Sequence, residues 1–181
     1  MKRHLFLAAQ HAALKIQREY DELEGIKGFD PEAIKILKTY PKKELGILDQ
    51  ATKIILNLLV QDRHDIESSE FSSKAAKIGF SRSHKGSCES LVFIGENFVV
   101  KSGYSVGTKP KAAIPTFEFK DSWVIQPRCE VYTELSAERK KQLVKEGIAD
   151  SYGWLQIAGA GRDAHSGNWG ILNGKYVQHD W

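Results

Sequence analysis

The sequence predicts an α+β protein in which helices come first and antiparallel strands follow. Before residue 65, apolar residues recur at steps of three and four, which is the spacing that places them on one face of a helix. Beyond residue 90, short β-branched and aromatic runs alternate with turn residues, and Asn173-Gly174 is the strongest of these turn signals. We therefore expect two units, an N-terminal helical region over residues 1–65 and a second domain over residues 76–181.

Capping residues and apolar stripes mark the helices. Asp30 before Pro31 is typical of an N-cap followed by proline at the first helical position, and Ser136 can cap a later helix. The widest apolar stripe predicts one long helix that is buried against more than one neighbour. Helices are expected over residues 5–23, 31–38, 42–61, 72–78 and 137–147.

Turn residues mark the strands. Gly95-Glu96-Asn97 separates two apolar runs, and Asn173-Gly174 supplies a tighter turn between two others. Turns this short join antiparallel neighbours, so the sheet is expected to be antiparallel. Strands are expected over residues 90–94, 98–101, 116–119, 123–126, 169–172 and 175–178.

Composition narrows the class of protein. The chain has 181 residues, of which 41% are hydrophobic and 27% are charged, and these fractions exclude collagenous and disordered chains. No apolar run approaches the roughly 18 residues of a membrane span. Cys88 and Cys129 lack metal-type spacing and are too few for a disulfide framework, so we expect a cytoplasmic protein. A net charge of +3 is far short of the basic excess that is typical of nucleic-acid-binding proteins, so we do not expect nucleic acid as a partner.

The segment that carries chemistry runs from Asp163 to Asn168, and Asp180 follows it after the Asn-Gly hairpin. Phosphoryl transfer from ATP needs a carboxylate that accepts a hydroxyl proton, together with oxygen ligands for Mg²⁺. Asp163 can supply the first, and Asn168 with Asp180 can supply the second. The alternative is a loop whose Asp and Asn side chains only bond their own backbone.

This pattern resembles the catalytic loop of the protein-kinase-like superfamily. Residues 163–168 match the D-x-H-x-x-N form found in aminoglycoside and choline kinases and in the early protein kinases of some bacteriophages. His179-Asp180-Trp181 is similar to the D-F-G motif that binds metal in the same family. The resemblance implies that Asp163 is the catalytic base, that Asn168 and Asp180 bind magnesium, and that His165 holds the loop by a hydrogen bond.

Residues further upstream agree in order with this resemblance. Lys85-Gly86-Ser87 is similar to the loop that covers the phosphates, and Lys101 is similar to the lysine that grips the α- and β-phosphates and serves catalysis. Residues 123–127 resemble the strand and hinge that bind adenine. Residues 76–181 would then form a minimal kinase-like domain with an antiparallel small-lobe sheet. The implied cofactors are ATP and Mg²⁺, and the implied nucleotide-binding residues are Gly86, Ser87, Lys101, Gln126 and Asn168.

The chain departs from the family pattern around the nucleotide. The phosphate loop has one glycine, Gly86, instead of three, and Gly161 stands where protein kinases carry a histidine. The region after Lys101 is too short for the helix whose glutamate pairs with that lysine. We expect the long helix before residue 65 to take its place, with Glu67 or Glu70 as the partner of Lys101.

The sequence stops one residue after Asp180. We therefore expect a truncated large lobe without an activation segment. The function that the resemblance to phage protein kinases implies is phosphoryl transfer to a serine or threonine of a host or partner protein. The alternatives are an inert kinase-like module that inhibits or scaffolds a partner, and a small-molecule kinase. A third alternative is that residues 1–65 form a docking unit, for which their mixed charges favour protein over DNA. The oligomeric state is left open.

Overall fold

A computed structural model of the chain describes residues 29–62, 66–83, 91–102, 109–119 and 123–180. The helix expected over residues 5–23 lies outside these residues. The described helices are α2 (Pro31–Thr39), α3 (Lys42–Leu45), α4 (Gln50–Gln61), α5 (Ser69–Lys77) and α6 (Ala137–Lys145), with a 3₁₀ turn at Tyr132–Glu134. The strands are β1 (Ser81–Ser83), β2 (Val92–Ile94), β3 (Phe98–Lys101), β4 (Phe117–Phe119), β5 (Trp123–Pro127), β6 (Glu130–Val131), β7 (Trp169–Leu172) and β8 (Lys175–Gln178).

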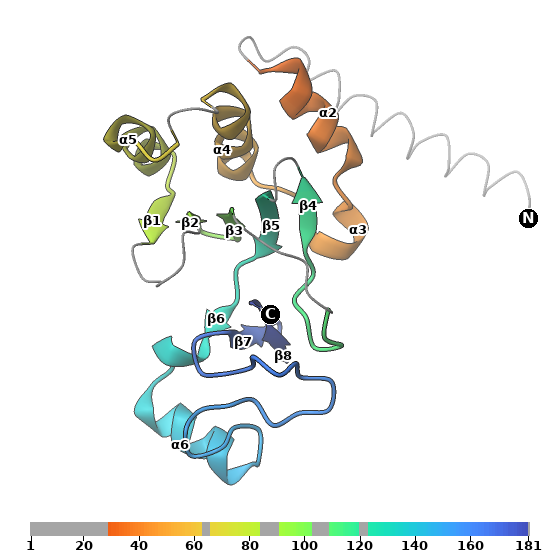
Figure 1. Cartoon of the computed structure of the whole chain (residues 1–181), viewed down its shortest axis with the longest axis vertical. Coiled ribbons are helices and arrows are strands. Elements are labelled where there is room, and N and C mark those ends of the chain that lie inside the picture. The colour runs from red at the N-terminus through yellow and green to blue at the C-terminus, as the bar shows by residue number, and fades with distance from the viewer. Residues whose placement is uncertain (1–28, 63–65, 84–90, 103–108, 120–122, 181) are drawn as a thin grey trace, which may run out of the picture.

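The α+β class predicted from the sequence is confirmed. Figure 1 shows α2, α4 and α5 gathered on one side of the sheet that holds β1 to β5, and a second part below it that contains α6 and β6 to β8. The first sheet has the order β1-β2-β3-β5-β4, and all its pairs are antiparallel. In the described part of the chain, no helix is long and apolar enough to span a membrane.

The prediction of a single helix over residues 42–61 is wrong, because the structure has two helices there, α3 and α4. Gly46 ends α3 with a φ of 85°, a conformation that glycine adopts without steric cost. Asp49 then starts α4, and its Oδ1 accepts hydrogen bonds from Thr52 N at 2.7 Å and Thr52 Oγ1 at 2.6 Å. A capping aspartate inside an apolar stripe therefore restarts the helix at a new angle.

The core of the first part lies between the helices and the sheet. Its buried members include Ile55 and Leu56 of α4, Phe71 of α5, and Val100 and Ile125 of the sheet. Helix α5 is longer than expected because Ser68, rather than a later serine, accepts the capping hydrogen bond from Phe71 N at 3.0 Å. Burial of this shared apolar surface is what fixes the helices onto the sheet.

Alternation along the strands gives the sheet a second face, which points away from the helices. On β3, Val100 belongs to the helical core, so Val99 and Lys101 point to the opposite face. The register pairs Val99 with Gln126 and Lys101 with Val124, which places these two β5 residues on the same face. Lys101 and Gln126 therefore project toward the second part of the molecule.

The second part is built around Trp169, which is completely buried. Its indole stacks on Tyr132 with ring centroids 4.6 Å apart, and its Nε1 donates to the carbonyl oxygen of Gly153 at 2.8 Å. The predicted Asn173-Gly174 hairpin is confirmed, with φ values of 51° and 76° that suit a tight turn between β7 and β8.

One connecting segment ties the two parts together. Ala113 forms a parallel bridge with Gln178 at the end of β8. Ile114 N donates to Gln178 O, and Gln178 N donates to Ala112 O, both at 2.8 Å. The chain that leaves the first sheet therefore lies along β8 before it returns as β4, and this contact positions the residues that follow β8.

Candidate functional site

Lys101 lies at the end of β3, where the first sheet meets the residues that follow β8. Only 8% of the residue is exposed. Its Nζ donates to the carbonyl oxygen of His179 at 2.6 Å and lies 3.5 Å from Asp180 Oδ1. Burial lowers the pKa of the Lys101 ammonium, and the Asp180 carboxylate partly offsets this effect. Lys101 is therefore a desolvated cation whose carboxylate neighbour, 57% exposed, faces solvent.

The loop from Asp163 to Asn168 holds its own carboxylate in place. Asn168 Nδ2 donates to Asp163 Oδ2 at 3.0 Å and to Asp163 O at 3.1 Å. His165 Nδ1 accepts a hydrogen bond from Gly167 N at 3.1 Å, which is the loop-holding contact expected of this histidine. The Asp163 side chain is nevertheless 64% exposed. Asp163 is thus oriented by Asn168 and open to an incoming molecule.

Backbone hydrogen bonds join this loop to Asp180. The carbonyl oxygen of Asn168 accepts from His179 N at 2.8 Å and from Asp180 N at 3.4 Å. The residues after β8 therefore contact the loop through their N–H groups and contact Lys101 through the carbonyl of His179. A continuous series of contacts connects Asp163, Asn168, Asp180 and Lys101.

Gln126 shares the His179 carbonyl with Lys101. Its Nε2 donates to that oxygen at 3.2 Å and to Thr116 Oγ1 at 3.1 Å, and only 2% of the residue is exposed. The side chain predicted to bind nucleotide thus points into the junction between the two parts. Two donors from neighbouring strands fix the position of the residue that precedes Asp180.

The imidazole of His179 is buried beside these groups. Burial, with a further contribution from the nearby Lys101 charge, lowers the pKa of His179 to about 4, so the ring is neutral at pH 7. Within the described residues, its Nε2 is buried without a hydrogen-bond partner. The site therefore contains one buried cation and a neutral imidazole next to two exposed carboxylates.

Gln178 is a positioning residue that the sequence analysis missed. It is completely buried, its Oε1 accepts from Gly161 N at 2.8 Å, and its Nε2 donates to Asp180 O at 2.9 Å. The signal that could have found it is Gly161, because a Cβ at that position would come within 3.0 Å of Gln178 Oε1. The glycine that departs from the kinase pattern leaves room for this glutamine.

The structure brings Lys101, Asp163, Asn168 and Asp180 together, with Gln126 beside them. Gly86 and Ser87, predicted to cover the phosphates, lie outside the described residues. The carboxylate of Glu70 lies 3.4 Å from Lys74 Nζ, and the backbone oxygen of Glu67 accepts from Arg82. The carboxylate found beside Lys101 is therefore that of Asp180, in place of the expected Glu67 or Glu70.

The chemistry of Asn168 and Asp180 fits Mg²⁺. The amide nitrogen of Asn168 donates to Asp163, which leaves the Asn168 Oδ1 as the group available to a metal, and the contact of Asp180 with Lys101 is made through Oδ1 of the carboxylate. Among the described residues, no cluster of three or more His, Cys, Asp or Glu side chains could hold a metal by itself. Two protein oxygens, completed by water and phosphate, are how Mg²⁺ is commonly bound in nucleotide sites.

The chain matches no model of a known protein family, and searches among curated proteins and solved structures find no match either.

Proposed function

We propose that the protein transfers the γ-phosphoryl group of ATP to a serine or threonine hydroxyl of a partner protein. The observation that supports this best is the convergence of Lys101 with Asp163, Asn168 and Asp180, which come from a segment more than 60 positions later in the sequence. A buried cation, an exposed carboxylate and two oxygen ligands are the groups that phosphoryl transfer requires. The same four residues carry the sequence resemblance to the protein-kinase-like superfamily.

Asp163 would act as the base. Its carboxylate accepts the proton of the acceptor hydroxyl as that oxygen bonds to the γ-phosphorus, while the bond from the γ-phosphorus to the β,γ-bridging oxygen breaks and ADP leaves. The hydrogen bonds from Asn168 keep the carboxylate in one orientation, and its 64% exposure allows a protein hydroxyl to reach it.

Lys101 would bind the α- and β-phosphates. Its ammonium has a low degree of hydration because it is buried, and a desolvated cation interacts more strongly with an anion than a hydrated one does. Val92 lies opposite Lys101 on β2, and Val99 lies two positions before it on β3. Both are half-buried on the same face of the sheet and would offer apolar surface beside the lysine to the nucleotide base. Asn168 and Asp180 would hold Mg²⁺, which supplies neutralisation of the phosphate charge when bound.

Two exposed aromatic residues beside the loop support a protein as the acceptor. Tyr152 is 82% exposed and Trp154 is 40% exposed. The Trp154 ring contacts the His165 ring edge-on, with centroids 5.9 Å apart. Asp150 Oδ1 accepts from both Tyr152 N and Trp154 N at 2.9 Å, so the aromatics sit on a fixed turn. Rigid exposed aromatics are typical of surfaces that bind proteins.

Asp163→Asn tests the proposal, because it keeps the shape of the side chain and removes the base. Transfer from γ-labelled ATP to dephosphorylated casein should fall by at least about 100-fold. Glu138→Gln, at an exposed position in the first turn of α6, is the matched control and should retain full transfer. Circular dichroism and thermal unfolding establish that both variants fold. Undiminished transfer by the Asp163→Asn variant would refute the mechanism.

The contact between Lys101 and Asp180 favours a second candidate function. Lys101 and Asp180, the predicted metal ligand, already neutralise each other at 3.5 Å. Such a contact is compatible with a site that has lost phosphoryl transfer. The protein would then be an inert kinase-like module that binds a partner. Calorimetry with ATP and Mg²⁺ separates the two, because nucleotide binding without any transfer supports the module, and measurable transfer excludes it.

A further inference from the structure

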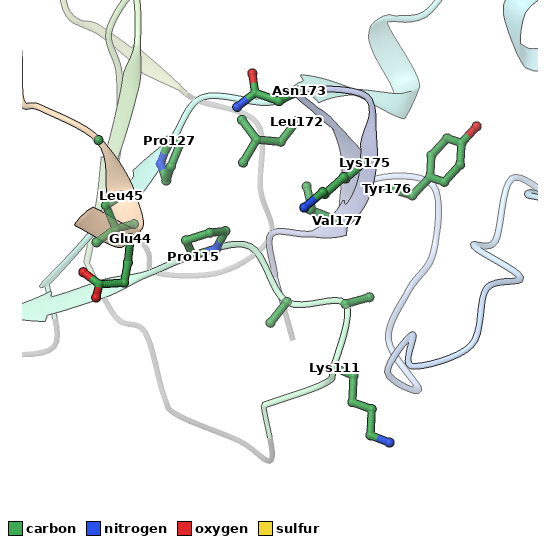
Figure 2. A pocket seen from close by; sticks show the side chains of 13 residues that line it. Glu44, Leu45, Lys111, Pro115, Pro127, Leu172, Asn173, Lys175, Tyr176 and Val177 are labelled. Atoms are coloured by element: carbon green, nitrogen blue, oxygen red, sulfur yellow. The ribbon is translucent and has the colours of Figure 1, made fainter. Parts of the chain in front are cut away.

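A cavity of about 480 Å³ lies apart from the candidate site, between α3 and the β7–β8 hairpin (Figure 2). Its apolar lining comes from Leu45 of α3, Pro115 of the connecting segment, Pro127 at the end of β5, and Leu172 and Val177 of the hairpin. This volume is within the range of sites for small molecules, which are lined mainly by apolar groups and a few polar ones.

The polar groups of the cavity are unevenly placed. Figure 2 shows the Lys175 side chain turned toward the side of the cavity formed by Glu44 and Pro115, whereas Lys111 extends away from it and the Tyr176 hydroxyl also points outward. Among the described residues, no carboxylate lies within ion-pair distance of the Lys175 ammonium. One uncompensated cation therefore borders an apolar floor.

We propose that this cavity binds a small amphipathic organic anion, with an apolar ring or short branched body and one carboxylate or sulfonate group. The body would replace water over Leu172, Val177 and Pro127, which is favourable in proportion to the apolar area that it covers. The anionic group would approach the exposed Lys175 ammonium at the edge of this apolar surface and gain its electrostatic attraction. Glu44 on the other wall disfavours a second negative charge on the ligand.

The cavity adjoins the residues that position the candidate metal ligand. Pro127 directly follows Gln126, whose side chain holds the His179 carbonyl, and Val177 directly precedes Gln178, which holds the Asp180 carbonyl. Val177 also packs against Cys129 in a small buried cluster. A ligand in the cavity would contact the two strands that position the candidate metal ligand.

Two fluorescent probes test the proposal on the full chain. The anionic probe is 8-anilinonaphthalene-1-sulfonate, and the neutral probe is N-phenyl-1-naphthylamine, which has the same body without the sulfonate. Lys175→Met should weaken binding of the anionic probe by about fivefold and leave binding of the neutral probe unchanged. Lys111→Met is the matched control, because it removes the same charge from a side chain that points away, and it should change neither affinity.

Equal affinity of the anionic probe for the wild-type and Lys175→Met proteins would overturn the proposal. It would also be overturned if Lys111→Met weakened the anionic probe as much, since the effect would then be one of overall charge. If Lys175→Met weakened binding of the neutral probe to the same extent, the proposal would also be overturned, because the ammonium would then not be what binds the anionic group. Thermal unfolding of each variant, with unchanged midpoints, excludes probe binding to a partly unfolded chain.

Discussion

Replacing Lys101 by methionine should separate function from stability. The change keeps the length and apolar part of the side chain and removes the ammonium. If Lys101 binds the nucleotide phosphates, phosphoryl transfer from ATP should be lost by at least about 100-fold. The protein should nevertheless remain folded and become slightly more stable, because the buried charge is a cost in the absence of nucleotide.

The size of the expected gain in stability follows from the groups around the Lys101 ammonium. Removal of one partner of a buried ion pair usually costs several kcal/mol because the other charge stays buried. Here the other partner, Asp180, is 57% exposed and can be solvated by water. The carbonyl oxygen of His179 also keeps its hydrogen bond from Gln126 at 3.2 Å. Because these two contacts are compensated, relief of the desolvated charge should raise the free energy of unfolding by about 1 kcal/mol at pH 7.

The pH dependence of the free energy of unfolding tests independently whether the buried Lys101 charge destabilises the protein. Because the pKa of Lys101 is lower in the folded state, the unfolded chain binds more protons than the folded one between the folded pKa and about 10.4. The stability of the wild-type protein therefore gains from this group as pH rises through that window. The advantage of Lys101→Met should shrink between pH 7 and pH 10 in urea denaturation. A variant less stable than wild type by about 2 kcal/mol at pH 7 would refute the reasoning.

Two further predictions concern buried groups near the site. Gln178→Leu leaves Gly161 N and Asp180 O without their hydrogen-bond partner and should lower the free energy of unfolding, measured in urea, by about 2–3 kcal/mol. The control Gln142→Leu, on the exposed face of α6, should change the free energy of unfolding little. Equal effects of the two substitutions would contradict the positioning role of Gln178. Burial raises the pKa of the Cys129 thiol to about 11. In a variant whose other cysteine is changed to serine, the folded protein should therefore react with a disulfide reagent at pH 8 about 100-fold more slowly than the unfolded chain. The reaction of the folded protein should become faster as pH approaches 11. Rapid reaction of the folded protein at pH 8 would show that Cys129 is accessible as a thiolate.

The elements with strong local signals could be predicted from the sequence. The hairpin at Asn173-Gly174 and the cap at Asp30 each depend on residues within a few positions of one another, and both are found where the sequence predicts them. The break at Gly46 was missed because apolar spacing continues through it, and only the hydrogen bonds of Asp49 reveal a new helix start. Strand β1 has no apolar pattern at all and forms because β2 offers an edge to it.

The candidate site could be predicted only in part. The spacing of Asp163 and Asn168 fixes a local loop, and their side chains do hydrogen-bond to each other. The partner of Lys101 could not be found this way, because it depends on how the end of β8 docks on β3, and Lys101 and His179 are 78 positions apart in the sequence. Glutamates were expected from the family pattern, whereas the contact in the structure comes from Asp180.

The atoms at this junction explain why side-chain patterns cannot reveal it. Lys101 and Gln126 donate to a carbonyl oxygen, Asn168 accepts through its carbonyl oxygen, and Gln178 joins a backbone N–H to a backbone carbonyl. Backbone atoms at residues 179 and 180 are present whatever their side chains are, so these contacts leave no mark on the identity of His179. They also make the site conditional on docking of the two parts. Asp180 reaches Lys101 only when the backbone after β8 is held on both sides. Under the proposed function, a substitution that loosens this junction should therefore reduce Mg²⁺ binding and stability together, whereas loss of the Asp163 carboxylate should reduce only phosphoryl transfer.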